Sequence, residues 1–377
     1  MVVDDQINSD FWLDFNKVIK QTIVPRFSGN SVRPCVEEDY KDYKNTLSSN
    51  LDNVMSLLSI ILKNKNQLTV ENNTQLVTVI TIIGEQSSKN VWNTSETVEV
   101  SKLLSLLVCK IFEKDNISKV FDDNIFLAVV MSLRPKLLKD TWKSYPGAVV
   151  CYKWLLQIIE KPFLKRHVAE VLPTALVIFD DYVQENQMIG LECIGIIIDH
   201  CQKSKSLKNC NYDEVIYQAL KKATSNIETN MIITLYTQIA KLLENICYCE
   251  GNINMFEWNK KDDILYILFS QMELQSDIDC RYAYIVSLRE LLNHSSIGKW
   301  SEHLTRILSE YCEDNRNLKI TSASLDLLCC NHKNSGEGSK EIMEKTKQCI
   351  SLLNKLCPNL SKEIMENDVI KSIINGK

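Results

Sequence analysis

The sequence predicts an all-α protein, built as a solenoid of stacked antiparallel helix pairs. Glycine supplies only 10 of the 377 residues and proline 7, well below their usual shares of about 7% and 5%. Tight hairpins and phosphate-binding loops need glycine because it adopts positive φ without a steric penalty. The chain should therefore have few turns and long elements. Its apolar residues, 45% of the total, fall in long runs with helical spacing.

Five helices are expected in the first part of the chain, and Pro25 ends the first of them. Residues 26–36, with Gly29 and Pro34, should form a loop. Residues 74–85 are rich in Val, Ile and Thr, which favours a strand. We nevertheless expect a helix there, because no partner strand is visible nearby. The predicted helices span residues 10–24, 51–62, 74–85, 96–113 and 122–139.

A break follows at residues 139–147, where Pro146 and Gly147 stand together. This pair predicts a turn before a helix over residues 148–160. We therefore expect an amino-terminal helical region, residues 1–138, and a regular solenoid, residues 139–377.

Four successive units after the break share one layout, a short helix, a polar turn and a longer helix. The longer helices begin near residues 185, 228, 277 and 318, a period of about 40 to 50 that matches HEAT and armadillo repeats. One helix pair cannot bury both of its faces alone, so neighbouring pairs must stack. The pairs span residues 172–180 with 185–201, 212–223 with 228–247, 262–272 with 277–293, and 299–313 with 318–330. A flexible loop near 331–340 and a last pair, 341–356 with 361–374, complete the prediction.

Charge and hydropathy exclude several classes of partner. The net charge of −5 gives no overall attraction to a phosphate backbone, so we expect no nucleic-acid partner. No apolar stretch reaches the roughly 18 to 20 residues that cross a bilayer, and no secretory signal pattern is present. We expect an intracellular protein with no membrane partner, in which the 14 cysteines are free thiols.

The sequence contains no motif for catalysis, cofactor binding or metal binding. Glycine-rich phosphate loops and nucleophile-elbow motifs are absent. Clusters such as Cys247 with Cys249 lack the spacing of a structural zinc site. We therefore expect no enzyme activity, no cofactor and no metal, and an enzyme embedded in helices is kept as a remote alternative.

The aspartates of the turns within the helix pairs, Asp181, Asp277 and Asp314, are suited to capping the second helices. Asp180 and Asp181, followed by Glu185, are interpreted in this way, with partner contact and catalysis as alternatives. Among the aromatic residues, Trp154 is expected in the core. Trp142 could belong either to the core or to an interface.

The stretch from Asp140 to His200 resembles the TELO-two-interacting protein two family, a subunit of the Triple-T (TTT) complex. The resemblance covers roughly residues 135–330, and Glu192 and Gly195 depart from it slightly. It rests on many positions in order: the run Trp142–Ala148, then Trp154, Pro162, His167, Val171–Pro173, Asp180, Asp181, Glu185, Asn186, Gly190–Cys193, Val215–Leu220 and Arg281–Ala283.

The resemblance implies a non-enzymatic adaptor that binds sister subunits of the TELO-two and TTI-one type. Through that complex it would support the Hsp-ninety chaperone machinery in folding and stabilising phosphatidylinositol-3-kinase-related kinases of the mTOR, ATM and ATR type. It also implies a cytoplasmic location, with the nucleus as a second one. An unrelated HEAT-repeat adaptor in trafficking or transport is the alternative. We expect docking on the concave face of the carboxy-terminal repeats. The motif and candidate interface residues are Trp142, Pro146, Gly147, Trp154, Pro173, Asp180, Asp181, Glu185, Asn186 and Gly190.

Overall fold

The computed structural model describes residues 7, 9–29, 33–67, 73–250, 257–292 and 300–313, with five isolated positions beyond them. Within these residues every regular element is a helix and none is a strand, which confirms the all-α fold class. The chain forms two compact units. We call residues 1–201 the amino-terminal unit and residues 202–377 the carboxy-terminal unit.

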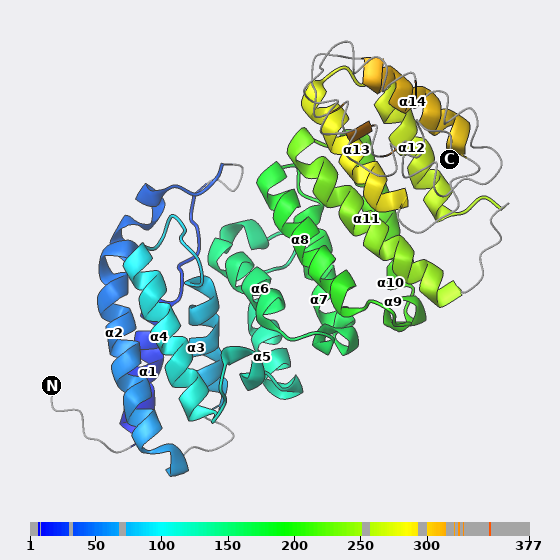
Figure 1. Cartoon of the computed structure of the whole chain (residues 1–377). Coiled ribbons are helices and arrows are strands. Elements are labelled where there is room, and N and C mark those ends of the chain that lie inside the picture. Colours follow the sequence, from blue (N-terminus) through cyan, green and yellow to red (C-terminus); the bar gives the residue numbers. More distant parts are fainter. Residues whose placement is uncertain are drawn as a thin grey trace. The chain divides into compact units, whose positions relative to one another are not determined.

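The helices of the amino-terminal unit pack against helices that lie at most three α-helices away along the chain. Helix α2 packs against α1 and α4, α3 packs against α4 and α6, and α7 packs against α8 (Figure 1). The helices are α1 (Ser9–Thr22), α2 (Lys41–Lys63), α3 (Asn73–Glu85), α4 (Ser95–Ile111), α5 (Asp123–Leu133), α6 (Pro146–Ile158), α7 (Val168–Phe179) and α8 (Gln184–His200).

Residues 73–85 form helix α3 despite their β-branched side chains, which confirms the predicted helix over residues 74–85. Val79, Ile80 and Ile82 are all completely buried, and α1, α4, α5 and α6 each contact this helix. Tertiary packing on several sides therefore overrides the strand propensity of the segment.

Three predicted helix boundaries were wrong by four residues or more. Helix α7 begins at Val168 and not at residue 172. Helix α2 begins at Lys41 and not at residue 51, because Leu47, which is fully buried, continues the apolar stripe into a polar stretch. Helix α5 ends at Leu133 and not at residue 139. Pro135 explains this end, since its ring nitrogen has no N–H to donate to the Met131 carbonyl four residues earlier.

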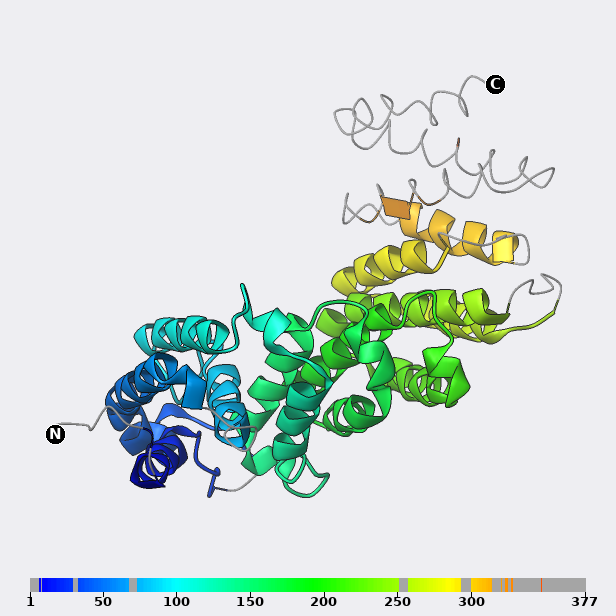
Figure 2. The ribbon, with the colours of Figure 1, turned by 90° about the horizontal axis from the view of Figure 1, so that it is seen from below.

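The carboxy-terminal unit shows the layered arrangement of HEAT-type pairs. Its helices are α9 (Ser206–Asn209), α10 (Tyr212–Ala223), α11 (Thr229–Glu250), α12 (Lys260–Leu274), α13 (Ile278–Leu292) and α14 (Ser301–Glu313). The second helices α11 and α13 lie side by side (Figures 1 and 2), and α12 packs against α14. An ion pair of 2.7 Å between Lys221 and Asp263 joins α10 to α12. The repeated helix pairs predicted over residues 212–293 are thus confirmed.

Helix capping in this unit follows the chemistry expected of polar turns. The Asn259 carboxamide oxygen accepts hydrogen bonds from the backbone N–H groups of Lys261 and Asp262 at the start of α12. The Asp277 carboxylate accepts one from the Cys280 N–H, 2.9 Å away, at the start of α13, which confirms its predicted capping role. Asp314 and the loop near 331–340 lie outside the described residues. The predicted helix over 318–330 and the last helix pair also lie outside them, apart from the five isolated positions.

The two compact units differ from the two regions that the sequence predicted. The predicted regions meet between residues 138 and 139. The division lies between Cys201 and Gln202. Helix α6 follows the predicted boundary, yet it packs along α3 and α8 within the amino-terminal unit. The Pro146–Gly147 break is a turn inside this unit, because a sequence breaker marks a change of direction and not the end of a packed core.

Candidate functional site

The turn that precedes α6 is packed into the amino-terminal unit. Trp142 is only 5% exposed, which decides its role in favour of the core. A Cβ atom added to Gly147 would lie 2.7 Å from the Val24 Cβ, so only glycine permits this close approach. The Phe27 N–H donates a hydrogen bond of 2.8 Å to the Ser144 carbonyl. The turn is therefore fixed against the extended segment 23–27.

Asp181 is the centre of a polar network that joins this turn to the turn between α7 and α8. Its side chain is 2% exposed, and one carboxylate oxygen lies 2.6 Å from the Lys143 Nζ. The same oxygen accepts the Tyr182 N–H at 2.8 Å. The other oxygen accepts the Asn186 side-chain amide at 2.6 Å. A buried carboxylate needs such partners, because burial without them is strongly unfavourable.

The predicted capping role of Asp181 was therefore wrong. Helix α8 begins at Gln184, and the residue before it, Val183, provides no side-chain cap. The Asp181 carboxylate binds a lysine from another turn, and the capping interpretation did not consider such a distant partner. Asp180 and Glu185 flank the turn between α7 and α8. Both are exposed, and Glu185 stands in the first turn of α8, where a negative charge interacts favourably with the helix dipole.

Two of the predicted residues lie where helices approach each other closely. A Cβ atom added to Gly190 of α8 would lie 2.5 Å from the Phe179 Cα of α7. Trp154 of α6 contacts α3 at Gly84, where an added Cβ would meet its ring at 2.7 Å. These residues allow helices to pack, and they offer no group for chemistry.

The ten predicted residues differ in burial. Trp142, Gly147, Asp181 and Gly190 are buried, while Pro146, Trp154 and Asn186 are half-buried, so Trp154 lies at the edge of the core and not within it. Lys143 contacts both Trp142 and Asp181. The Asn186 side-chain amide donates to Asp181, and Pro146 begins α6. Pro173, Asp180 and Glu185 are exposed. Sequence reasoning missed Tyr182, whose side chain is 67% exposed and whose ring centroid lies 4.3 Å from the Lys143 Nζ. The signal in the sequence was an aromatic residue directly after the two turn aspartates, Asp180 and Asp181.

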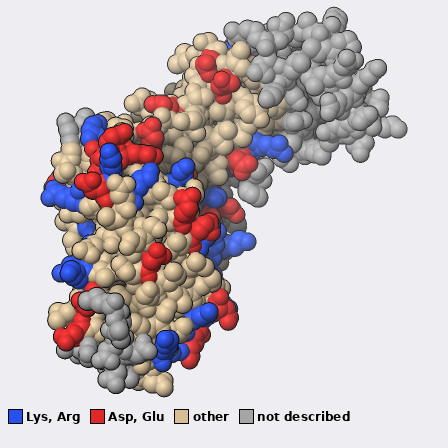
Figure 3. Space-filling view, turned by 90° about the vertical axis from the view of Figure 1, so that its left-hand side faces the viewer, with Lys and Arg blue, Asp and Glu red and all other residues tan. Residues whose placement is uncertain are grey.

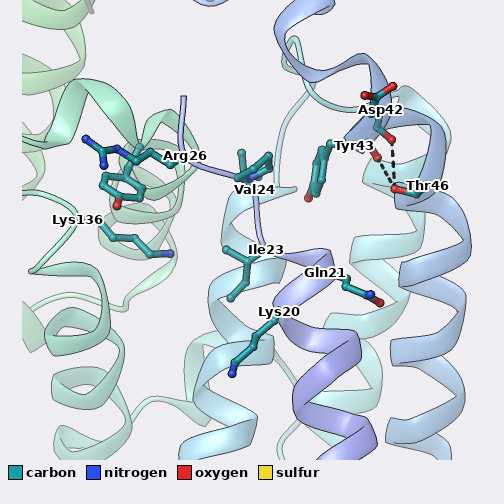
Figure 4. Close-up of a pocket in the computed structure, with 11 residues that line it drawn as sticks. Lys20, Gln21, Ile23, Val24, Arg26, Asp42, Tyr43, Thr46 and Lys136 are labelled. Atoms are coloured by element: carbon teal, nitrogen blue, oxygen red, sulfur yellow. Dashed lines mark hydrogen bonds between the residues drawn. The ribbon is translucent and has the colours of Figure 1, made fainter. Parts of the chain in front are cut away.

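A pocket of about 620 Å³ opens beside the extended segment 23–27 (Figure 4). It was not predicted from the sequence, because residues from four separate stretches line it. Lys20 and Gln21 come from α1, and Lys136 comes from the turn after α5. The full lining is Lys20, Gln21, Ile23, Val24, Pro25, Arg26, Asp42, Tyr43, Thr46, Lys136 and Tyr145.

A buried carboxylate, Glu85, lies behind this pocket. It is 1% exposed, accepts the Val24 N–H at 2.8 Å and lies 3.6 Å from the Lys136 Nζ. Burial raises the pKa of Glu85 to about 7, although Lys136 and the Val24 N–H act in the opposite direction. Desolvation therefore outweighs the two favourable contacts.

Charged side chains of both signs lie on the surface of the described part of the chain. No group of His, Cys, Asp and Glu side chains among them could hold a metal ion. On the side of the molecule shown in Figure 3, acidic and basic side chains are interspersed around a broad uncharged area. None of the helices in the described part of the chain is long and apolar enough to cross a membrane.

Comparisons with solved structures give only distant likenesses. A chain from a structure of Kap95p with RanGDP aligns with a TM-score of 0.48 and 12% identity, covering 94% of this chain and 44% of that chain. An engineered protein aligns with a TM-score of 0.44 and 11% identity, covering 96% and 92%. Both scores are below 0.5, and no function follows from them.

Comparisons with curated proteins are more informative. No family model matches the chain. TELO2-interacting protein 2 of Homo sapiens is 25% identical over 233 residues, 59% of this chain and 46% of that protein. The protein of that name from Rattus norvegicus is 25% identical over 249 residues, 62% of this chain and 48% of that protein.

The protein of that name from Mus musculus is 37% identical over 100 residues, 26% of this chain and 19% of that protein. The chain thus spans about half the length, or less, of the curated relatives it matches. These similarities confirm the family resemblance expected from the sequence, and the chain is a homologue of the proteins named TELO2-interacting protein 2.

Proposed function

We propose that this chain is a non-enzymatic adaptor subunit of a TTT-type complex and that it binds a protein of the TELO2 kind. One observation carries the proposal, the similarity to proteins named TELO2-interacting protein 2 over about 60% of the chain. The architecture supports it, because stacked helix pairs present extended surfaces that suit protein binding. Fold alone does not determine function, so the specific partner comes from the homology.

The finer part of the proposal concerns the whole complex. We propose that the chain also contacts a TTI-one-type subunit and that the complex supports Hsp90-dependent stabilisation of phosphatidylinositol-3-kinase-related kinases. Its location would be the cytoplasm, with the nucleus as a second site. These partners are proposals for the whole protein, since the chain spans about half of its human and rat relatives.

Affinity capture of the full chain tests this function. The tagged protein, expressed at its native level, is expected to capture a TELO2-type protein, a TTI-one-type protein and kinases of this class. Depleting the chain is expected to lower the abundance of those kinases. Capture of none of these proteins at native expression would contradict the proposal.

A charge-reversal pair sharpens the test. Glu185 is exposed at the start of α8 within the region of family resemblance, and Glu99 is exposed on α4 outside it. If the exposed motif residues contact a sister subunit, Glu185→Lys reduces capture, whereas Glu99→Lys leaves it unchanged. Equal capture by both variants would remove the turn between α7 and α8 from the interface without contradicting the complex itself.

A further inference from the structure

Charge is distributed unequally around the pocket beside segment 23–27. Lys20, Arg26 and Lys136 lie on one side of the extended segment, and Asp42 lies on the other (Figure 4). The pocket thus has a cationic end, formed by three basic side chains from three parts of the fold. A bound group with negative charge would experience a favourable field at that end.

The basic groups of this end are available for a ligand. Neither Lys20 nor Arg26 has an ion pair within the part of the chain that the structure describes, and both are exposed. Arg26 is held over the Tyr145 ring, with its guanidinium carbon 5.8 Å from the ring centroid. Lys136 lies 3.6 Å from the buried Glu85, and its ammonium group has three donors, so it can bind a second acceptor.

The rest of the lining suits the backbone and the apolar groups of a peptide. Ile23, Val24 and Pro25 form an apolar strip next to Tyr43 and Tyr145. The volume of about 620 Å³ lies in the range of sites for drug-sized ligands. An isolated phosphate ion would fill only a small part of it, whereas a few residues of an extended peptide would occupy it.

The pocket wall is held in place before any ligand binds. Val24 is fixed by its hydrogen bond to Glu85, and Phe27 is fixed by its bond to Ser144. The Tyr43 hydroxyl donates to the Thr22 carbonyl at 2.5 Å, where α1 ends. A wall that is already ordered lowers the entropy cost of binding.

We propose that this pocket binds an acidic peptide segment of a partner protein. Its carboxylates would face Lys20, Arg26 and Lys136, and its aliphatic groups would lie on Ile23, Val24 and Pro25. The site is independent of the proposed complex, because its ligand is defined by charge and shape alone. It would exist whether or not the chain binds a TELO2-type protein.

Fluorescence anisotropy with the purified full chain tests this site. The probe is a fluorescein-labelled peptide of alternating glutamate and leucine, compared with a peptide in which glutamine replaces glutamate. The acidic peptide is expected to bind and the glutamine peptide is not. Lys20→Gln and Arg26→Gln should each weaken binding by about two- to fivefold, as expected for partly exposed charge pairs, and Arg26→Lys should restore much of the loss.

Lys17→Gln is the matched control, since Lys17 is exposed on the same helix but does not line the pocket. Equal weakening by Lys17→Gln and Lys20→Gln would show general charge attraction and would overturn the proposal. Equal binding of the two peptides would also overturn it. Displacement of the probe by inorganic phosphate as readily as by unlabelled acidic peptide would identify a simple anion site in place of a peptide site.

Discussion

At the residue scale, Glu85 links the stability of the protein to pH. Burial raises its pKa from 4.5 to about 7, so the folded state holds this proton more tightly than the unfolded state. The stability contributed by the protonated form is fully present below pH 4.5 and is lost as the pH rises to about 7. The loss is on the order of 3 kcal/mol, from about 1.4 kcal/mol for each pKa unit.

We expect Glu85→Gln to remove most of this loss. Glutamine keeps an acceptor for the Val24 N–H and cannot ionise. Urea unfolding at a series of pH values should therefore show a flatter profile for the variant than for the unmodified chain. Glu38→Gln, which changes an exposed carboxylate, is the control. A variant profile that fell as steeply as the original would show that Glu85 is not responsible.

Asp181 is a second residue with a large expected effect. In Asp181→Asn the added amide group would face the Asn186 amide, which is also a donor, and Lys143 would lose its charge partner. Urea unfolding should show a loss of about 1 to 3 kcal/mol. Glu185→Gln, an exposed change on the neighbouring helix, should stay within about 0.5 kcal/mol.

A double-mutant cycle with Lys143→Met would separate the contact from the individual changes. Coupling of about 0.5 to 3 kcal/mol is expected between residues in one network. Additive effects of Asp181→Asn and Lys143→Met would contradict the direct ion pair.

The role of Asp181 shows what the sequence could not predict. Its position in a turn and its acidity were visible, but its partner Lys143 lies 38 residues away. Local patterns reveal caps such as Asp277, because donor and acceptor are close in the chain. The pocket was missed for the same reason, since Lys20, Arg26 and Lys136 share no local pattern.

At the scale of elements, apolar periodicity predicted the described helices well and their ends less well. Helix α3 was predicted against its propensity because no partner strand was available. The end of α5 was missed although Pro135 marks it, and the start of α2 was missed because only Leu47 continues the stripe. Ends depend on one or two residues, whereas a helix face depends on many.

The close approach of α7 and α8 gives a prediction for one glycine. Gly190→Ala ordinarily favours a helix by up to about 1 kcal/mol. Here the new Cβ would lie 2.5 Å from the Phe179 Cα, and backbone atoms cannot move aside as a side chain can. We expect a net loss of about 1 to 3 kcal/mol in urea unfolding, with Glu185→Ala on the same helix as the control. Increased stability of Gly190→Ala would show that the two helices are not packed as described.

At the scale of the whole molecule, the two compact units and the family resemblance do not coincide. The resemblance covers roughly residues 135–330, while the units meet between Cys201 and Gln202. The homologous region therefore includes residues of both units. Tests of partner binding require the full chain, whereas the stability of the amino-terminal unit can be examined separately.

Two fragments, residues 1–201 and residues 1–138, can show where the first packed core ends. The structure places this end at residue 201, and the sequence predicted it at residue 138. Residues 1–201 contain every contact described between α3, α6, α7 and α8. Residues 1–138 lack α6, so Val24 would lose its contact with Gly147 and the buried face of α3 would be exposed to water. Exposing such apolar surface removes a main source of stability.

We expect the fragment 1–201 to be monomeric in gel filtration and to unfold cooperatively in urea, followed by circular dichroism. The fragment 1–138 should unfold at lower urea with a broad transition, or aggregate through its exposed α3 face. The comparison needs no assumption about how the two units are arranged. Fragment 1–138 ends within the amino-terminal unit, and fragment 1–201 ends at its boundary. If 1–138 unfolded as cooperatively as 1–201 and at the same urea concentration, the core would end before the Trp142–Gly147 turn, and the boundary suggested by the sequence would be the physical one.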